Sequence, residues 1–346
     1  MMIDPAMSDL ISLYPYILGR AIYREAFMRQ YESKPSSLPA LSGFLGIDWS
    51  GAKGQRHTGL QLAMARTGTA APHSLTPPHA TSWSRPDVLD LLLGLAADTA
   101  DAAMLVGIDF AFAHPFVDVG AYYPGRADAP ATPAALWAHA EAINAAEPYL
   151  YGGAMFGHAV WGDFYLAPPH YAAARYQSRR RITELAARAA GRSPSPTFKA
   201  VGADNVATGS LAGMRLLHQL KQKLANRVAV WPFDPIVLGQ TKLILVEIFP
   251  SFYFYRLGMV PARRAAAHVG FLNQALAAYD SAGMASDFVP AGKDADEADA
   301  IIAAAALRYF AGANGFALPP AQEPAMRQEG WIFGVPEWPD AVAGQP

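Results

Sequence analysis

The sequence contains no cysteine, and this absence excludes several kinds of chemistry at once. Disulfide bonds, thiol nucleophiles and cysteine-ligated zinc or iron–sulfur centres all require that residue. Charged residues are also scarce, at 16% of the 346 residues, whereas hydrophobic residues make up 52%. A chain of this length and composition can bury a large core, so it is neither disordered nor fibrous.

Long apolar runs are absent as well, because no segment reaches the ~18 residues that a transmembrane helix requires. The first residues carry acids ahead of their apolar run and no basic segment, which is a poor match to a signal peptide. We therefore expect a cytoplasmic protein without a membrane partner. The net charge of −2 argues against general polyanion binding, so a surface for nucleic acid would have to be a local patch.

Hydrophobic patterning predicts an α/β fold that opens with three strands, a helix and a further strand. These elements are expected at residues 44–47, 57–64, 73–83, 85–100 and 104–108. Ser84 is a suitable N-cap for the helix, and Pro86 suits its first turn. The order of the elements favours an antiparallel start followed by a parallel crossover.

The rest of the chain mixes helical segments with two short apolar strands. Helices are expected near 133–146, 179–190, 211–225, 262–280 and 294–311, and strands at 228–231 and 243–246. We expect an N-terminal extension over residues 1–41, one domain over 42–335 and a short tail over 336–346. Within the domain, residues 114–225 have the character of a long helical insertion.

Three of the apolar strands end in an acid, namely Asp48, Asp109 and Glu247. A carboxylate at the end of a buried strand needs compensation for its charge, and the carboxyl ends of parallel strands meet at one edge of a sheet. Because neighbouring strands lie ~4.8 Å apart, such acids could share one divalent cation or a pair of cations. Oxygen ligands favour Mg²⁺ or Mn²⁺. The alternative is that each acid caps a turn or a following helix.

A fourth acid comes from the helix expected at 294–311. Asp299 lies on the same helical face as Ile302, Ala306 and Phe310, so it should face the core. A buried acid is costly unless a cation or a hydrogen-bond partner compensates it. Asp296 lies one turn earlier on the same face. For Asp296 the alternative is a first-turn acid that the helix dipole favours.

Seven segments, taken in order along the chain, resemble a known family. They are GIDWSGAK, VGIDFAFAHP, KAVGADNVATGSLAGM, WPFD, LVEIFPSFYF, DEADAIIAAAAL and EGWIFGV. The family is one of predicted nucleases with a ribonuclease H-like fold, known as domain of unknown function 429, and the resemblance covers about residues 42–335. It implies a mixed five-stranded sheet, flanked by helices, whose first three strands are antiparallel.

The same resemblance implies a metal site made of acids at the sheet edge and on the last helix. Asp48 matches the acid of the first strand, while Asp109 and Glu247 match acids on later strands. Asp296 and Asp299 match the closing helix.

Basic residues gather between positions 175 and 199, against the single acid Glu184. They are Arg175, Arg179, Arg180, Arg181, Arg188, Arg192 and Lys199. Patches of this kind hold phosphate backbones, and we take Arg179, Arg180, Arg181 and Lys199 as candidates. The alternative is a solvated helix face.

Two further segments could contact a phosphate. Lys53 follows Asp48 closely, and Ser210 ends a Gly- and Thr-containing loop that opens a helix, where free N–H groups can face an anion. Plain capping by Thr208 or Ser210 is the alternative. His114 could shuttle protons near the metals, but a structural hydrogen bond is the more common role of a loop histidine. The aromatic residues of 249–255 could stack bases or belong to the core.

The leading hypothesis is a metal-dependent nuclease in which Asp48, Asp109, Glu247 and Asp299 are the catalytic acids around two Mg²⁺ or Mn²⁺ ions. One alternative is an actin-like phosphotransferase or ATPase that uses residues 48–51 as a phosphate loop. Another is an inactive module that binds nucleic acid or protein.

Overall fold

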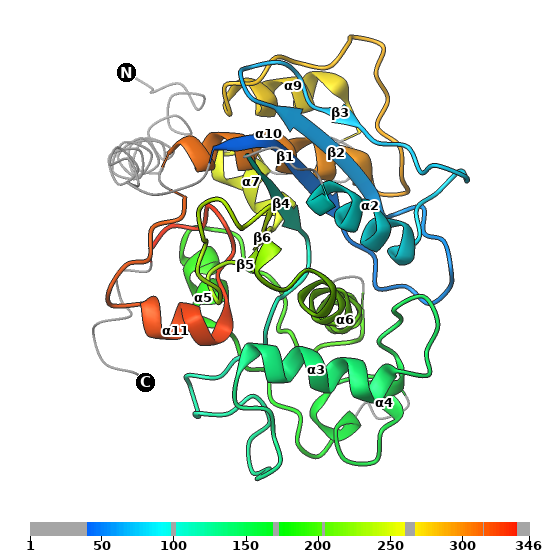
Figure 1. Cartoon of the computed structure of the whole chain (residues 1–346), viewed down its shortest axis with the longest axis vertical. Coiled ribbons are helices and arrows are strands. Elements are labelled where there is room, and N and C mark those ends of the chain that lie inside the picture. The colour runs from blue at the N-terminus through cyan, green and yellow to red at the C-terminus, as the bar shows by residue number, and fades with distance from the viewer. Residues whose placement is uncertain are drawn as a thin grey trace, which may run out of the picture.

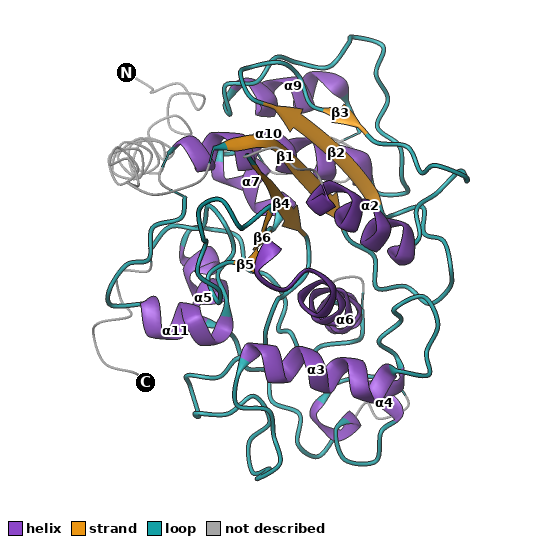
Figure 2. Cartoon of the chain, in the orientation of Figure 1, coloured by secondary structure: helices purple, strands orange, loops and turns teal. Residues whose placement is uncertain are grey.

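A computed structural model describes residues 40–97, 102–168, 173–202, 205–259, 267–313 and 315–337. These residues form a mixed sheet with helices on both faces (Figures 1 and 2). The expected N-terminal extension and C-terminal tail lie outside the described residues, apart from residues 40–41 and 336–337.

The sheet has six strands, each of which the hydrophobic patterning predicted, so the five-stranded sheet that the family resemblance implied was wrong by one edge strand. In spatial order the strands are β3 (His73–Ser74), β2 (Gln61–Arg66), β1 (Leu41–Asp48), β4 (Ala103–Ile108), β6 (Leu243–Glu247) and β5 (Val228–Val230). The pairs β3–β2 and β2–β1 are antiparallel, whereas β1–β4, β4–β6 and β6–β5 are parallel. The predicted antiparallel start and parallel crossover are therefore confirmed.

The third strand is much shorter than the expected 73–83 because its pairing with β2 ends at Ser74. Pro77 and Pro78 follow at once, and a proline has no N–H to donate to a strand ladder. The second strand begins at Gln61 rather than at residue 57. His57 instead forms an isolated bridge with Trp83.

Helices connect and cover the strands. They are α2 (Arg85–Ala97), α3 (Pro133–Asn144), α4 (Ala154–Gly157), α5 (Ile182–Ala189), α6 (Ala207–Leu224), α7 (Pro250–Arg256), α9 (Val269–Ala277), α10 (Asp296–Gly312) and α11 (Glu323–Glu329), with short 3₁₀ turns at Gly162–Phe164 and Ala225–Arg227. Buried residues of α7, α9 and α10 pack on one face of the sheet, and those of α2 and α6 pack on the other. Helix α3 lies beside α6 (Figure 1).

Helix α2 begins as the sequence predicts. The Asp87 N–H donates to the Ser84 hydroxyl over 3.1 Å, and the Ser84 N–H donates to the Asp87 carboxylate over 2.9 Å. This reciprocal pair satisfies two N–H groups that the first helical turn leaves without partners. The predicted N-cap at Ser84 is therefore confirmed.

The approach of α10 to the sheet is unusually close at Gly46. A Cβ atom there would lie 2.4 Å from the Ala300 carbonyl oxygen and 2.8 Å from the Ala304 nitrogen. Gly46 pairs with Gly107 across the β1–β4 ladder, and the face of α10 that meets the sheet is rich in alanine. The missing side chains let α10 run directly over β1 and bring the acidic start of the helix to the end of that strand.

No helix of the described ranges is both long and apolar enough to cross a membrane.

Gly46→Ala should destabilise the fold by about 1–3 kcal/mol or more, because the new methyl group meets helix backbone that cannot move aside without shifting α10. The matched control is Gly94→Ala on α2, where an added Cβ meets nothing within 4 Å. That control should stabilise by roughly 0.5–1 kcal/mol through helix propensity. Urea unfolding of both variants measures the difference, and equal effects would contradict the close-packing explanation.

Candidate functional site

Four of the predicted acids lie at the same edge of the sheet. Asp48 is the last residue of β1, Asp109 directly follows β4, and Glu247 is the last residue of β6. Asp299 lies in the first turn of α10. Asp48 and Glu247 are buried, with 8% and 3% of their surface exposed, whereas Asp109 and Asp299 are half-buried.

Burial and neighbouring acids raise the pKa of three of these acids. Burial raises the pKa of Asp48 well above its ordinary value, and the charges of Asp299 and Asp109 raise it further. Burial also raises the pKa of Asp109, with Asp299 and then Glu247 adding to the effect. For Asp299, burial and the neighbouring Asp296 raise the pKa to about 7. The folded protein is therefore less stable when these carboxylates are charged than when they are protonated.

Asp296 is the outer member of the group. It is half-buried beside Gly292, where a Cβ atom would lie 2.3 Å from its carboxylate oxygen. Burial raises the pKa of Asp296, and its charge raises the pKa of both Asp48 and Asp299. Asp296 thus adds negative charge to the same edge from one helical turn away.

These acids are not arranged as a ready-made ligand set. Within the described ranges, no group of three or more His, Asp or Glu side chains is positioned to hold a metal ion. In the same part of the chain, no basic side chain forms an ion pair with Asp48, Asp109 or Asp299. Their charge is left to be balanced by protons or by a cation.

Glu247 differs from the other acids because the protein supplies its counter-ion. Arg181 Nη2 lies 2.5 Å from Glu247 Oε1, and Arg181 Nη1 donates to Oε2 over 2.7 Å. The Phe112 N–H also donates to Oε2, over 3.0 Å. A bidentate pair of this kind compensates a buried carboxylate, so Glu247 does not share the charge excess of the three aspartates.

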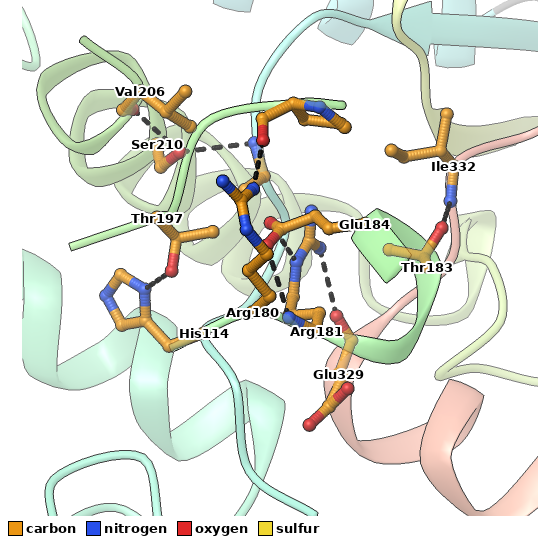
Figure 3. A network of polar contacts seen from close by, with 12 residues as sticks. His114, Arg180, Arg181, Thr183, Glu184, Thr197, Val206, Ser210, Glu329 and Ile332 are labelled. Carbon is orange, nitrogen blue, oxygen red and sulfur yellow. Dashed lines mark hydrogen bonds and ion pairs between the residues drawn. The ribbon is translucent and has the colours of Figure 1, made fainter. Parts of the chain in front are cut away.

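Arg181 forms hydrogen bonds to residues of α5, α11 and β6. Its Nε donates to Glu184 Oε1 on α5 and its Nη1 donates to the Glu329 carbonyl at the end of α11, each over 3.0 Å (Figure 3). The Glu329 carboxylate accepts from the N–H groups of Phe116, Val117 and Ile182 over 2.6 to 2.8 Å. Thr183 accepts from the Ile332 N–H in the same region (Figure 3).

The other arginines of the basic run also turn inward. Arg179 is 8% exposed, forms a bidentate pair with Asp118, and donates to the carbonyls of Pro115, Ala121 and Tyr122. Arg180 is half-buried and donates to the Pro194 carbonyl. Arg179 and Arg181 therefore cannot be the exposed phosphate contacts that the basic run predicted, because each guanidinium is buried against internal acceptors.

Ser210 is also placed in the interior rather than at a phosphate. Its hydroxyl donates to the Val206 carbonyl over 2.9 Å and accepts from the Ala111 N–H over 3.2 Å, which ties α6 to the segment after β4. Asn205, one residue before the N-cap residue Val206, accepts from the Thr208 N–H. The expected alternative of capping by Thr208 or Ser210 was wrong, because both residues lie within α6.

Lys53 and Lys199 lie at the periphery. Lys53 is exposed, with its Nζ 5.9 Å from the centre of the Tyr151 ring, and Lys199 is half-buried. The Lys199 carbonyl accepts from the N–H groups of Val206 and Ala207, so these two donors at the start of α6 are already bonded within the protein. Neither observation tests a contact with phosphate, which stays a prediction for both lysines.

His114 has the structural role that sequence reasoning offered as the alternative. It is fully buried, with Nδ1 2.9 Å from the Thr197 hydroxyl and Nε2 2.9 Å from the Tyr165 hydroxyl. Its ring stacks on Phe198 at 4.2 Å. Burial and the nearby charges of Arg181 and Arg179 lower the pKa of His114 well below its ordinary value, so the ring is neutral near pH 7.

A cavity of about 590 Å³ opens beside the acids. Asp109 and Glu247 line it together with Arg181 and Glu184, and the loop at 192–195 and the start of α6 at 205–209 form its other wall. Trp49, Phe110 and Phe249 contribute aromatic surface. Asp109 is thus the member of the aspartate group that the cavity reaches directly.

Sequence reasoning named residues 48–51 as a possible phosphate loop and Arg192 as part of the basic run, but it did not place them in one cavity with the start of α6. The Trp49 Nε1 donates to the Gly209 carbonyl over 3.0 Å, and a Cβ on Gly51 would lie 2.2 Å from the Gly209 nitrogen. The loop after β1 therefore rests on the first turn of α6. Gly51 allows this close approach to Gly209. Nothing in the sequence indicates that these two glycines lie together.

Comparisons with family models, with curated proteins and with solved structures found no match to this chain.

Arg181→Met should destabilise the protein by about 3–5 kcal/mol, because it leaves Glu247 and Glu184 buried without their counter-ion. Arg188→Met is the matched control, since Arg188 is an exposed residue of α5, the helix that Arg181 precedes, and it should change stability by no more than about 0.5 kcal/mol. Denaturant unfolding measures both. Adding Glu247→Gln to Arg181→Met should recover part of the loss. A cost for Arg181→Met as small as that of the control would contradict the compensating role of this ion pair.

Stability should also fall as pH rises through the pKa of Asp299. Its pKa in the folded protein, about 7, lies above the unfolded value of 3.8, so the folded state binds the extra proton. That stabilisation is complete below pH ~4 and is lost as the pH rises to about 7, by at most about 4 kcal/mol. Unfolding free energies of wild type and Asp299→Asn measured across this pH range should differ in slope. Asp90→Asn, an exposed change on α2, should keep the wild-type slope. Parallel curves for wild type and Asp299→Asn would refute the assignment.

Proposed function

We propose that this protein is a divalent-metal-dependent hydrolase of phosphodiester bonds in which Asp48, Asp109 and Asp299 hold Mg²⁺ or Mn²⁺. The observation that carries the proposal is the grouping of these three acids at one edge of the sheet, where Asp109 lines the cavity, without a basic partner for any of them in the described part of the chain. A donor set of carboxylate oxygens suits these hard cations. Asp296 would contribute from the outer turn of α10.

The topology supports placing this chain among ribonuclease H-like folds. Three strands are antiparallel, the next is parallel to the first, and acids end the central strands β1 and β4. Strand β5 is an addition at the edge beyond β6. On this proposal Asp48 is the acid of the first strand and the start of α10 closes the site.

A bound cation would lower the pKa of an attacking water and stabilise charge on the leaving oxygen. The residues of the chain would prepare this chemistry. Asp48 and Asp109, at the ends of two paired strands, would hold the cation, and Asp299 would contribute a third carboxylate from the first turn of α10. Glu247 acts differently from our sequence-based expectation, because Arg181 already neutralises it. We assign it a positioning role, since it accepts from the Phe112 N–H and so orients the segment that carries Asp109.

The described residues contain one sheet, which gives no support to a two-domain clamp for ATP of the actin-like kind. The proposal therefore does not extend to a kinase or ATPase.

Asp48→Asn and Asp109→Asn should each lower hydrolysis of bis(p-nitrophenyl) phosphate by on the order of 100-fold or more in the presence of Mn²⁺, because each removes a charged ligand of the cation. Asp90→Asn should retain wild-type activity. Chelation of the metal should abolish activity in the wild type, and added Mn²⁺ should restore it. The proposal would be disproved if the hydrolysis rate were unchanged by a metal chelator, or if it were unchanged when both aspartates are replaced.

A further inference from the structure

We infer that the cavity beside Asp109 binds a small zwitterion, that is, an apolar molecule that carries both an ammonium group and a carboxylate group. Free amino acids and short peptides share this chemistry. The inference goes beyond the proposed function and requires no metal ion. It is carried by the two charged side chains of the cavity that have no charged partner.

The charged residues that line the cavity fall into two groups. Arg181 pairs with both Glu247 and Glu184, so these three side chains are bonded to one another within the protein. Asp109 and Arg192 remain. Among the described residues, neither of them forms an ion pair. The cavity therefore offers a ligand one acid and one base.

Asp109 and Arg192 lie at different depths. Asp109 is half-buried directly after β4, whereas Arg192 is exposed, and its Nε donates to the Ser251 hydroxyl over 2.8 Å. Both line the same cavity, so a ligand that carries two opposite charges can place its ammonium group at Asp109 and its carboxylate at Arg192. A simple anion would leave Asp109 without a partner, and a simple cation would leave Arg192 without one.

The rest of the lining suits an apolar body. The cavity volume of about 590 Å³ lies within the range of roughly 300–1,000 Å³ that is typical of small-molecule sites. Phe249 lines the cavity and is half-buried, so part of its ring can contact a ligand. Ile248 and Ile332 are buried and add aliphatic surface to the lining. Apolar walls with a few polar groups that fix orientation are characteristic of such sites.

The test is calorimetric titration of the full chain with phenylalanine, phenethylamine and phenylpropionate. All three have the same aromatic body, and the last two each keep only one of the two charges. We expect phenylalanine to bind about 10- to 100-fold more tightly than phenylpropionate, because the ammonium group adds a charge-assisted hydrogen bond to a half-buried carboxylate. We expect it to bind about 2- to 5-fold more tightly than phenethylamine, because ion pairs to an exposed arginine are weak.

Variants of the two side chains assign each end of the ligand. Asp109→Asn should remove the difference in affinity between phenylalanine and phenylpropionate and keep the difference from phenethylamine. Arg192→Met should have the opposite effect. Arg188→Met changes an exposed residue that does not line the cavity, so it should keep both differences. Tighter binding of alanyl-phenylalanine than of phenylalanine would identify a short peptide as the source of the zwitterion, and the reverse would identify a free amino acid.

The inference would be overturned if phenylalanine bound no more tightly than its two analogues, or if the differences persisted in the matching variants. Titration with Mn²⁺ alone tests the proposed function separately. Mn²⁺ binding without phenylalanine binding would overturn only this inference, and the opposite result would overturn only the proposed function. If both bind, Mn²⁺ should weaken the binding of phenethylamine, because both need the Asp109 carboxylate, and unchanged phenethylamine binding would overturn this inference.

Discussion

The buried ion pair between Arg181 and Glu247 determines which acids at this edge of the sheet have a compensated charge and which do not. Burial of a charge is tolerated when a counter-ion and hydrogen bonds compensate it. Glu247 has both, from Arg181 and from the Phe112 N–H. Asp48, Asp109 and Asp299 have no basic partner in the described ranges, and burial together with neighbouring acids raises their pKa values. Glu247 is therefore held in an ion pair, whereas the three aspartates retain an excess of negative charge.

The fold brings this excess charge together through the packing of α10. Gly46 permits the helix backbone to lie against β1, and the register of β1 with β4 sets Gly46 beside Gly107. Any side chain at Gly46 would push α10 away and carry Asp299 with it. The acids are thus held at a common edge by backbone contact, and the cavity beside Asp109 gives a ligand access to that edge.

The sequence predicted elements well where the pattern is local. The strand ending at Asp48 and the capping of α2 by Ser84 depend on neighbouring residues, and both appear in the structure. It also predicted β5 as a strand at 228–231, whereas its place at the edge beside β6 depends on pairing with a later segment of the chain. Helix α6 begins at Ala207, one turn before the expected residue 211, and Asn205 just ahead of it accepts from the Thr208 N–H.

The basic run shows why the site was harder to predict than the fold. A sequence displays the charge of Arg179 and Arg181 but not their partners. Asp118 lies 61 residues from Arg179, and Glu247 lies 66 residues from Arg181. Such contacts arise only when the chain has folded, so charge density alone could not distinguish an exposed patch from an internal network. For the same reason, the pairing of Glu247 with Arg181 could not be predicted from the sequence.

The most direct test of the account is a crystal structure of the protein grown with Mn²⁺, with anomalous scattering used to locate the ion. We predict an anomalous peak bound by carboxylate oxygens of Asp48, Asp109 and Asp299, with Glu247 still paired to Arg181. A crystal with saturating Mn²⁺ and no peak at this edge, or with Arg181 displaced and Glu247 as the principal ligand, would contradict the division of the acids on which the account rests.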